Sequence, residues 1–342
     1  MKNILLVTFP VDLGNRTIES NLHSLFSDDM DFFRFAAQHA DELDKGINYG
    51  RSVRDRLLSM YSLRKALSPH VHANKTVLFN GLSPAFLSYG SWKSENTAIV
   101  FDWTRLLYPA VLGTEIKKDW VFYLHRHVLR ACPKILCWTD SIMNNLQEHY
   151  GVNPSQLYKV PAPFLVENFD IPPRPTPKVP RVLFVGGDLK RKGGDILLDN
   201  YHTLLKSKCK LTMMTNDPTA NIDGINFQSG IRYGTAAHKK IYEENDILVL
   251  PTRIDAYPQV IGEAAAAGLA VITSQFALGA NEVVLNNVSG YISETQQGCI
   301  DSLLNLLNTP VLIDEFKSAG YKHMHTKFSR EQIRKLYLEV LK

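Results

Sequence analysis

The chain has 342 residues, 45% hydrophobic and 21% charged, with a formal net charge of +4, which is typical of an ordinary two-domain protein. No apolar run reaches the roughly 18 residues that a membrane-spanning helix needs, and four cysteines without CxxC spacing indicate neither a disulfide framework nor a zinc site, so we expect a cytoplasmic protein. The modest charge, without basic runs interleaved with aromatic residues, argues against nucleic acid as a partner.

The first half alternates apolar runs that predict buried strands with helical stretches. The loop over residues 9–15 follows the first strand and precedes a helix from about 16 to 25. Because ligands bind at the carboxyl ends of parallel strands, Gly14 and Asn15 in this loop, and Asp102 directly after a later strand, are ligand-facing candidates. The predicted strands of this half cover residues 3–8, 76–79, 98–101, 135–138 and 158–160.

Residues 49–67 form a helical, basic stretch with an apolar stripe. One interpretation is a surface helix that packs its stripe on the core. The other is a patch that contacts anionic lipid head groups or an anionic acceptor. The cations are Arg51, Arg54, Arg56, Arg64 and Lys65.

The best domain boundary is the region from 161 to 180, which contains seven prolines and no long apolar periodicity. We therefore predict one domain over 1–163 and a second over 164–328. A capping box at Ser329 and Gln332 predicts a last helix in residues 329–342, which could pack back on the first domain.

The second half opens with the segment VLFVGGDLKRKGGDILL, in which a strand over 181–185 runs into glycines and cations before a helix. Glycines with cations at such a turn suit a diphosphate, which needs close backbone approach and positive charge. The pattern is neither GxGxxG nor GxxxxGK[ST], so the sequence lacks the main motif of a dinucleotide-dependent dehydrogenase and that of a Walker-type NTPase. A solvated cationic turn is the alternative interpretation.

Residues 246–274 predict a compact strand, helix and strand, with Pro258 as the first helical residue. Asp255 and Glu263 lie eight residues apart beside the helix amino terminus. A helix amino terminus favours an anion, whereas carboxylates favour hydroxyl donors. A nucleotide-sugar offers both a diphosphate and vicinal diols. The alternative is a loop acid and a solvated helix residue.

Two successive α/β sets predict two doubly wound, Rossmann-like domains that face each other across a cleft. Asp29 and Asp31 have the spacing of a DxD metal pair, but short acids between a helix and a strand are ordinary turn residues. We expect no metal and no cofactor.

The ordered segments VLFVGGDLKRKGG, NDILVLPT, DAYPQVIGEAAAAGLAVITS and NEVVLNNVSGYI resemble the carboxyl-terminal domain of glycosyltransferase family 4. These are retaining nucleotide-sugar transferases with the GT-B fold. The ordered set covers about half of the chain and is far more specific than a single glycine loop. The first half resembles the family more loosely.

The resemblance places the family's Glu-x7-Glu motif on Asp255 and Glu263, with the first acid one methylene shorter than usual. It implies that Asp255 holds donor-sugar hydroxyls, that Glu263 holds the ribose, and that Lys192 binds the diphosphate. Gly187 stands where many members have a second diphosphate-binding Arg, and Arg191 is a candidate substitute. The implied donor-binding residues are Gly186, Gly187, Arg191, Lys192, Tyr257, Pro258, Gln259, Val260 and Glu263.

The function implied is transfer of a sugar from a nucleotide diphosphate sugar to an acceptor hydroxyl with retention of configuration, in glycan, polysaccharide or glycolipid biosynthesis. Asp255, Lys192 and Asp102 are the catalytic candidates, while Gly14, Asn15 and Asp102 are candidates for the acceptor side. The expected partners are the donor, a carbohydrate or lipid-linked acceptor and, peripherally, an anionic membrane at its inner face. A nucleotide-sugar epimerase and a non-catalytic nucleotide-sugar-binding protein are the alternatives.

Overall fold

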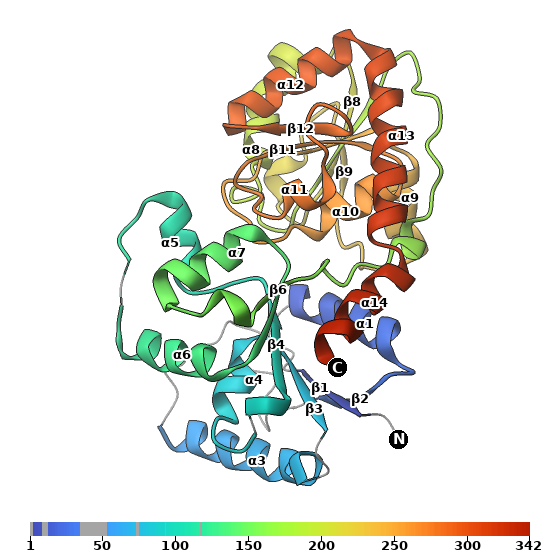
Figure 1. Cartoon of the computed structure of the whole chain (residues 1–342). Helices are drawn as coiled ribbons and strands as arrows, with labels where there is room; N and C mark the ends of the chain where they lie inside the picture. Colours follow the sequence, from blue (N-terminus) through green and yellow to red (C-terminus); the bar gives the residue numbers. More distant parts are fainter. Residues whose placement is uncertain (1–2, 9–12, 35–52, 73–74, 93, 117) are drawn as a thin grey trace. The chain divides into compact units, whose positions relative to one another are not determined.

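The structure is a computed structural model that describes residues 3–8, 13–34, 53–72, 75–92, 94–116 and 118–342 (Figure 1). The chain divides into two units, Met1–Pro163 with Ile333–Lys342, and Phe164–Gln332. Each unit is built on its own six-stranded parallel sheet. The predicted class, two Rossmann-like α/β domains of GT-B type, is confirmed.

The sheet of the first unit has the order β2-β1-β3-β4-β5-β6. Its inner strands are almost entirely buried, as expected for parallel strands covered by helices on both faces. The strands are β1 Ile4–Thr8, β2 Met30–Arg34, β3 Thr76–Asn80, β4 Thr97–Phe101, β5 Lys134–Cys137 and β6 Leu157–Lys159.

Helices of the first unit connect these strands. The last helix of the chain, α14 (Arg330–Leu341), adds buried side chains to the same unit: Tyr337 accepts a hydrogen bond from Trp138 Nε1 at 3.0 Å and its ring lies 5.3 Å from that of Phe26. The core of this unit therefore depends on residues from both ends of the chain. The connecting helices are α1 Leu13–Phe26, α3 Val53–His72, α4 Leu82–Leu87, α5 Leu107–Leu112, α6 Trp120–Ala131 and α7 Asp140–Asn145, which continues as η2 Leu146–Tyr150.

The sheet of the second unit has the order β12-β11-β10-β7-β8-β9. From β7 the chain moves outward in one direction to β8 and β9 and then returns to β10 on the other side of β7. This reversal creates a topological switch point between β7 and β10, where α/β folds bind ligands. The strands are β7 Arg181–Val185, β8 Lys210–Met214, β9 Asn226–Gln228, β10 Ile247–Leu250, β11 Ala270–Ser274 and β12 Gly290–Ser293.

A buried cation fixes helix α13 (Pro310–Lys327) to this sheet. The Lys317 side chain is only 2% exposed, and its Nζ donates to Arg174 O at 2.6 Å and to Asp246 Oδ1 at 3.2 Å. Asp246, at the start of β10, also accepts from Arg181 Nε at 3.0 Å. The other helices are α8 Gly194–Asn200 with η5 Tyr201–Leu205, α9 Ala236–Glu243, α10 Gln259–Ala266, α11 Ala280–Val283 and α12 Gln296–Asn308.

Two predicted helix starts change. Helix α1 begins at Leu13, so Gly14 and Asn15 lie in its first turn rather than in a loop. A glycine is tolerated there because the first amides of a helix have no intrahelical partner to lose. Pro258 occupies the cap position of α10, with ψ of 107°, and is not the first helical residue. The predicted basic helix is α3, and residues 49–52 lie outside the described residues.

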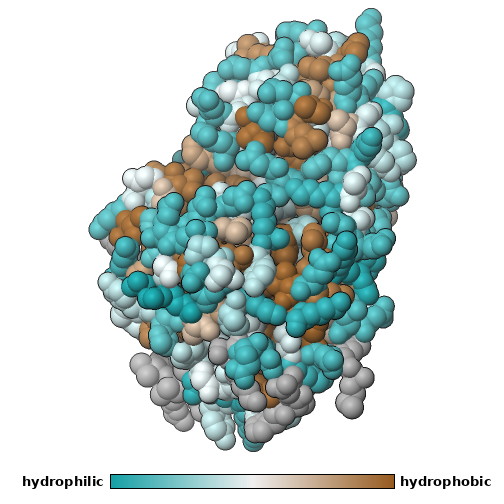
Figure 2. Space-filling model, in the orientation of Figure 1, coloured by the Kyte–Doolittle hydropathy of each residue, from teal (hydrophilic) through white to brown (hydrophobic). Residues whose placement is uncertain are grey.

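On the face seen in Figure 2, hydrophilic side chains predominate and hydrophobic ones gather in small clusters. Within the part of the chain that the structure describes, no helix is long and apolar enough to cross a membrane.

Candidate functional site

The two predicted ligand loops meet at the switch point of the second unit. Strands β7 and β10 are parallel neighbours, with Val182 opposite Ile247 and Leu183 opposite Leu248. Their carboxyl ends therefore share one edge of the sheet, where β7 continues into the glycine-rich turn 186–194 and β10 into the loop 251–258. The sequence motifs lie far apart in the chain and are brought together by strand pairing.

The glycine-rich turn is tightly folded. Gly193 has φ of +78°, and a Cβ on it would lie 1.9 Å from the carbonyl oxygen of Pro251, so only glycine fits against the second loop. By contrast, a Cβ on Gly187 would meet nothing within 4 Å. The amides of Lys192 and Gly194 donate to Asp188 O and Leu189 O at 3.0 and 2.8 Å. These two amides are therefore engaged within the turn itself, whereas its cationic side chains remain as groups that can face a ligand.

Backbone and side-chain contacts fix the second loop to this turn. Arg253 N donates to Arg191 O at 2.8 Å, and the Arg253 guanidinium forms a bidentate pair with Asp195, both distances being 2.8 Å. Sequence reasoning missed the Arg253–Asp195 pair. The bidentate geometry holds the loop rigidly on the first turn of α8.

Asp255 is the point at which the two loops meet through functional side chains. Lys192 Nζ donates directly to Asp255 Oδ2, and Arg191 Nη1 lies 3.6 Å from the same oxygen. The backbone of Asp255 is fixed by hydrogen bonds with Phe276 O at 2.9 Å and Leu278 N at 2.8 Å. The structure thus brings together the predicted acid, the predicted lysine and Arg191, the candidate replacement for the arginine that many family members have at the position of Gly187.

Glu263 lies deeper, on α10, and is 2% exposed. Burial raises its pKa from 4.5 to about 7, although a hydrogen bond from the Tyr242 hydroxyl and the charge of Lys192 act in the opposite direction. His238 Nε2 lies 3.9 Å from Glu263 Oε2, and burial lowers the pKa of His238. Sequence reasoning missed Tyr242 and His238, but their spacing of four residues on α9 predicts a shared helix face.

The amino terminus of α10 carries the other predicted donor-binding residues. The first amides of this helix, on Gln259 and Val260, have no intrahelical acceptor by geometry. Both polar atoms of the Gln259 side chain are buried, and they have no hydrogen-bond partner among the described residues. The ring of Tyr257 packs closely against Gly279, because a Cβ added to Gly279 would lie 2.4 Å from a ring carbon.

The candidates of the first unit do not form an equivalent cluster. Asp102 directly follows β4 and is partly buried; burial raises the pKa of the Tyr337 hydroxyl, and the charge of Asp102 adds to that rise. The next residue, Trp103, is 46% exposed. Gly14 and Asn15 lie outside the described side chains, so the structure gives them only a helical position.

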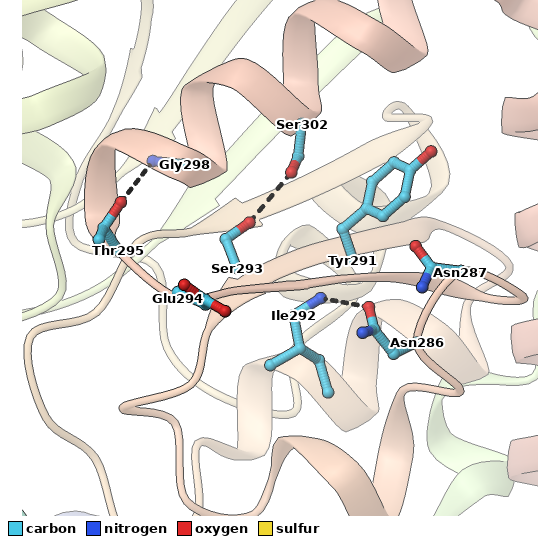
Figure 3. A pocket seen from close by; sticks show the side chains of 9 residues that line it. All are labelled: Asn286, Asn287, Tyr291, Ile292, Ser293, Glu294, Thr295, Gly298 and Ser302. Atoms are coloured by element: carbon cyan, nitrogen blue, oxygen red, sulfur yellow. Dashed lines mark hydrogen bonds between the residues drawn. The ribbon is translucent and has the colours of Figure 1, made fainter.

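Two depressions open on the second unit. The larger, about 480 Å³, lies at the edge strand β12 and contains none of the predicted site residues (Figure 3). Ser293 and Ser302 face each other there at 3.0 Å. The smaller, about 280 Å³, is lined by residues that include Phe169, Tyr233 and His238. Because His238 also approaches Glu263, the smaller depression adjoins the candidate site.

The described residues contain no group of three or more His, Cys, Asp or Glu side chains placed to hold a metal ion. The two acids of the DxD spacing form ion pairs, Asp29 with Arg334 at 2.8 Å and Asp31 with Lys75.

Residues 179–309 match the family model described as glycosyl transferases group 1. No curated protein matches the chain significantly. Among solved structures, a sucrose-phosphate synthase from Thermosynechococcus elongatus is similar, with a TM-score of 0.76, 14% identity and 99% of both chains covered. HepE from Anabaena in complex with UDP and glucose has a TM-score of 0.73 and 12% identity, covering 100% of this chain and 99% of that one. A glycosyltransferase from Rickettsia africae has a TM-score of 0.71 and 14% identity, covering 99% and 98%. The family model thus matches a stretch of the second unit, and the solved structures share the fold of the chain.

Proposed function

We propose that this protein transfers a sugar from a nucleotide diphosphate sugar to an acceptor hydroxyl with retention of configuration, as glycosyltransferase family 4 enzymes do. The observation that carries the proposal is the meeting of Lys192, Arg191 and Asp255 at the switch point of a unit whose residues 179–309 match the group 1 family model. Cations and a hydroxyl-binding acid at one point suit a diphosphate joined to a sugar.

The diphosphate competes with Asp255 for Lys192. When phosphate oxygens take over the Lys192 ammonium, the Asp255 carboxylate is released to accept hydrogen bonds from the sugar hydroxyls. Arg191 is close enough to share the phosphate charge, which compensates for the glycine at 187. The amino terminus of α10 adds its amides and the Gln259 side chain to the same anion.

The nucleoside lies on the Glu263 side of this anion site. Its ribose hydroxyls bond to Glu263 and replace part of the contact with Tyr242. The depression beside His238, with the rings of Phe169 and Tyr233 in its wall, gives the base an aromatic surface. UDP-sugars are the first donors to test, since HepE, a structure of the same fold, is described in complex with UDP-glucose, at 13% identity.

In the reaction the bond between the anomeric carbon and the diphosphate oxygen breaks, and the acceptor oxygen bonds to the same face of the sugar. The departing phosphate takes the proton of the acceptor hydroxyl, so the step balances without a separate base. Lys192 and the α10 amino terminus stabilise the charge that develops on the diphosphate. Asp102 and the Gly14–Asn15 region belong to the acceptor side, in the biosynthesis of a glycan, polysaccharide or glycolipid.

The test begins with thermal-shift measurements against a panel of nucleotides and nucleotide-sugars, because a ligand that binds only the folded state raises Tm. The stabilising donor is then incubated with carbohydrate and lipid-linked acceptors, and the anomeric configuration of the product is read by NMR. A product with inverted configuration would refute the retaining mechanism. Turnover of the donor without acceptor would favour the epimerase, and binding without any turnover would favour the non-catalytic protein.

A further inference from the structure

Helix α6 of the first unit has two apolar faces. One is buried and includes Phe122 and Leu129. The other is exposed: Trp120 is 63%, Tyr123 56% and Leu124 40% accessible. Their spacing of three and four residues places them on one stripe of the helix. Large apolar side chains gathered on one exposed stripe mark an interaction surface.

Positive charge accompanies this stripe. Helix α6 contains Arg126 and Arg130 and no acidic residue, and Arg64 and Lys65 are exposed on α3. Asp119, the cap residue of α6, is paired with the Arg105 guanidinium at 2.9 and 3.1 Å. The surface around the stripe therefore favours an anionic partner.

Tyr89 joins the exposed stripe of α6 to that of α3. Its hydroxyl lies 2.7 Å from His127 Nε2, one turn beyond Tyr123 and Leu124, and its carbonyl accepts from the Arg64 guanidinium. Arg64 follows Tyr61, which is 66% exposed, by three positions on α3. We call the exposed aromatic and cationic side chains of these two linked helices the α3–α6 face; α4 packs against both helices (Figure 1).

We infer that this α3–α6 face docks on an anionic lipid bilayer, with Trp120, Tyr123 and Leu124 entering the boundary between head groups and acyl chains. Trp and Tyr favour that boundary because each has an apolar ring with a polar edge. Lys and Arg beside them are attracted to anionic head groups. This contact is independent of the donor site in the second unit.

The experiment compares pelleting of the full chain with vesicles of phosphatidylcholine alone and with vesicles partly composed of phosphatidylglycerol. The test variant is Trp120→Ser/Tyr123→Ser/Leu124→Ser. The matched control, Leu285→Ser/Val288→Ser/Val311→Ser, removes three exposed apolar side chains of the second unit, which are 39%, 54% and 70% accessible. Because all six side chains are exposed, both variants should fold, which thermal unfolding checks.

We expect the wild type and the control to pellet with the anionic vesicles only, and the test variant to lose on the order of tenfold or more in partitioning. Binding should also weaken as salt is raised. Absence of wild-type binding, equal pelleting with both vesicle types, or unchanged binding of the test variant would each overturn the proposal. A second copy of this chain as the partner would overturn it as well. In that case light scattering would show a dimer for the wild type and the control and a monomer for the test variant, and the wild type would not bind vesicles.

Discussion

The charge state of Glu263 gives a prediction that is independent of any substrate. Burial raises the pKa of this carboxyl from 4.5 to about 7, so ionising it costs on the order of 3 kcal/mol more in the folded chain than in the unfolded one. Below about pH 4.5 the carboxyl is neutral in both states, so the free energy of unfolding is not reduced by this group. The free energy of unfolding falls as the pH rises from about 4.5 towards about 7, and above pH 7 the contribution of Glu263 to this fall stays constant.

Glu263→Gln removes the titration but keeps an oxygen that can accept from the Tyr242 hydroxyl. The variant should match the wild type near pH 4 and exceed it by up to about 3 kcal/mol near pH 8. Urea unfolding across this range measures the difference. The control is Glu294→Gln, which removes an exposed carboxyl of the same unit. If the free energies of unfolding of Glu263→Gln and the wild type differ by the same amount at every pH, Glu263 does not titrate as its burial implies.

Three further substitutions test the site and its scaffold. Lys192→Ala should lower kcat/KM in a donor-turnover assay by roughly a hundredfold, which corresponds to about 3 kcal/mol of transition-state stabilisation. The control Lys190→Ala changes an exposed lysine of the same turn and should have little effect. Equal activity of the two variants would contradict the role of Lys192. Gly193→Ala should destabilise the fold by at least about 2 kcal/mol because its Cβ would lie 1.9 Å from a carbonyl oxygen, whereas Gly187→Ala, with open space around it, should stay within about 0.5 kcal/mol in denaturant unfolding. Lys317→Met should cost about 2 to 3 kcal/mol in the same assay, since it removes one of the two cations paired with the buried Asp246 carboxylate and leaves only Arg181; a loss below about 1 kcal/mol would show that the buried Lys317–Asp246 pair is dispensable.

The strands could be predicted because a buried parallel strand has a simple signature. Residues 247–250 are four consecutive apolar residues closed by a proline, and they form β10 over that range. Helix starts were harder to predict because they depend on a few backbone angles. The start of α1 moved by three residues, since a glycine does not prevent a first helical turn.

The site could be predicted only as separate motifs. That Lys192 touches Asp255, 63 residues later, follows from the pairing of β7 with β10, which no local pattern specifies. The Arg253–Asp195 pair was missed for the same reason. The depth of Glu263 was also unpredictable, because its burial depends on how Tyr242 packs over it.

The return of α14 to the first unit has a consequence for folding during synthesis. The ribosome completes the whole second unit before it makes residues 333–342, which the first unit needs to cover Trp138 and Phe26. The unit whose synthesis starts first is therefore the last to finish its core. In a chain truncated after Gln332, the second unit should still resist proteolysis while the first remains open to cleavage.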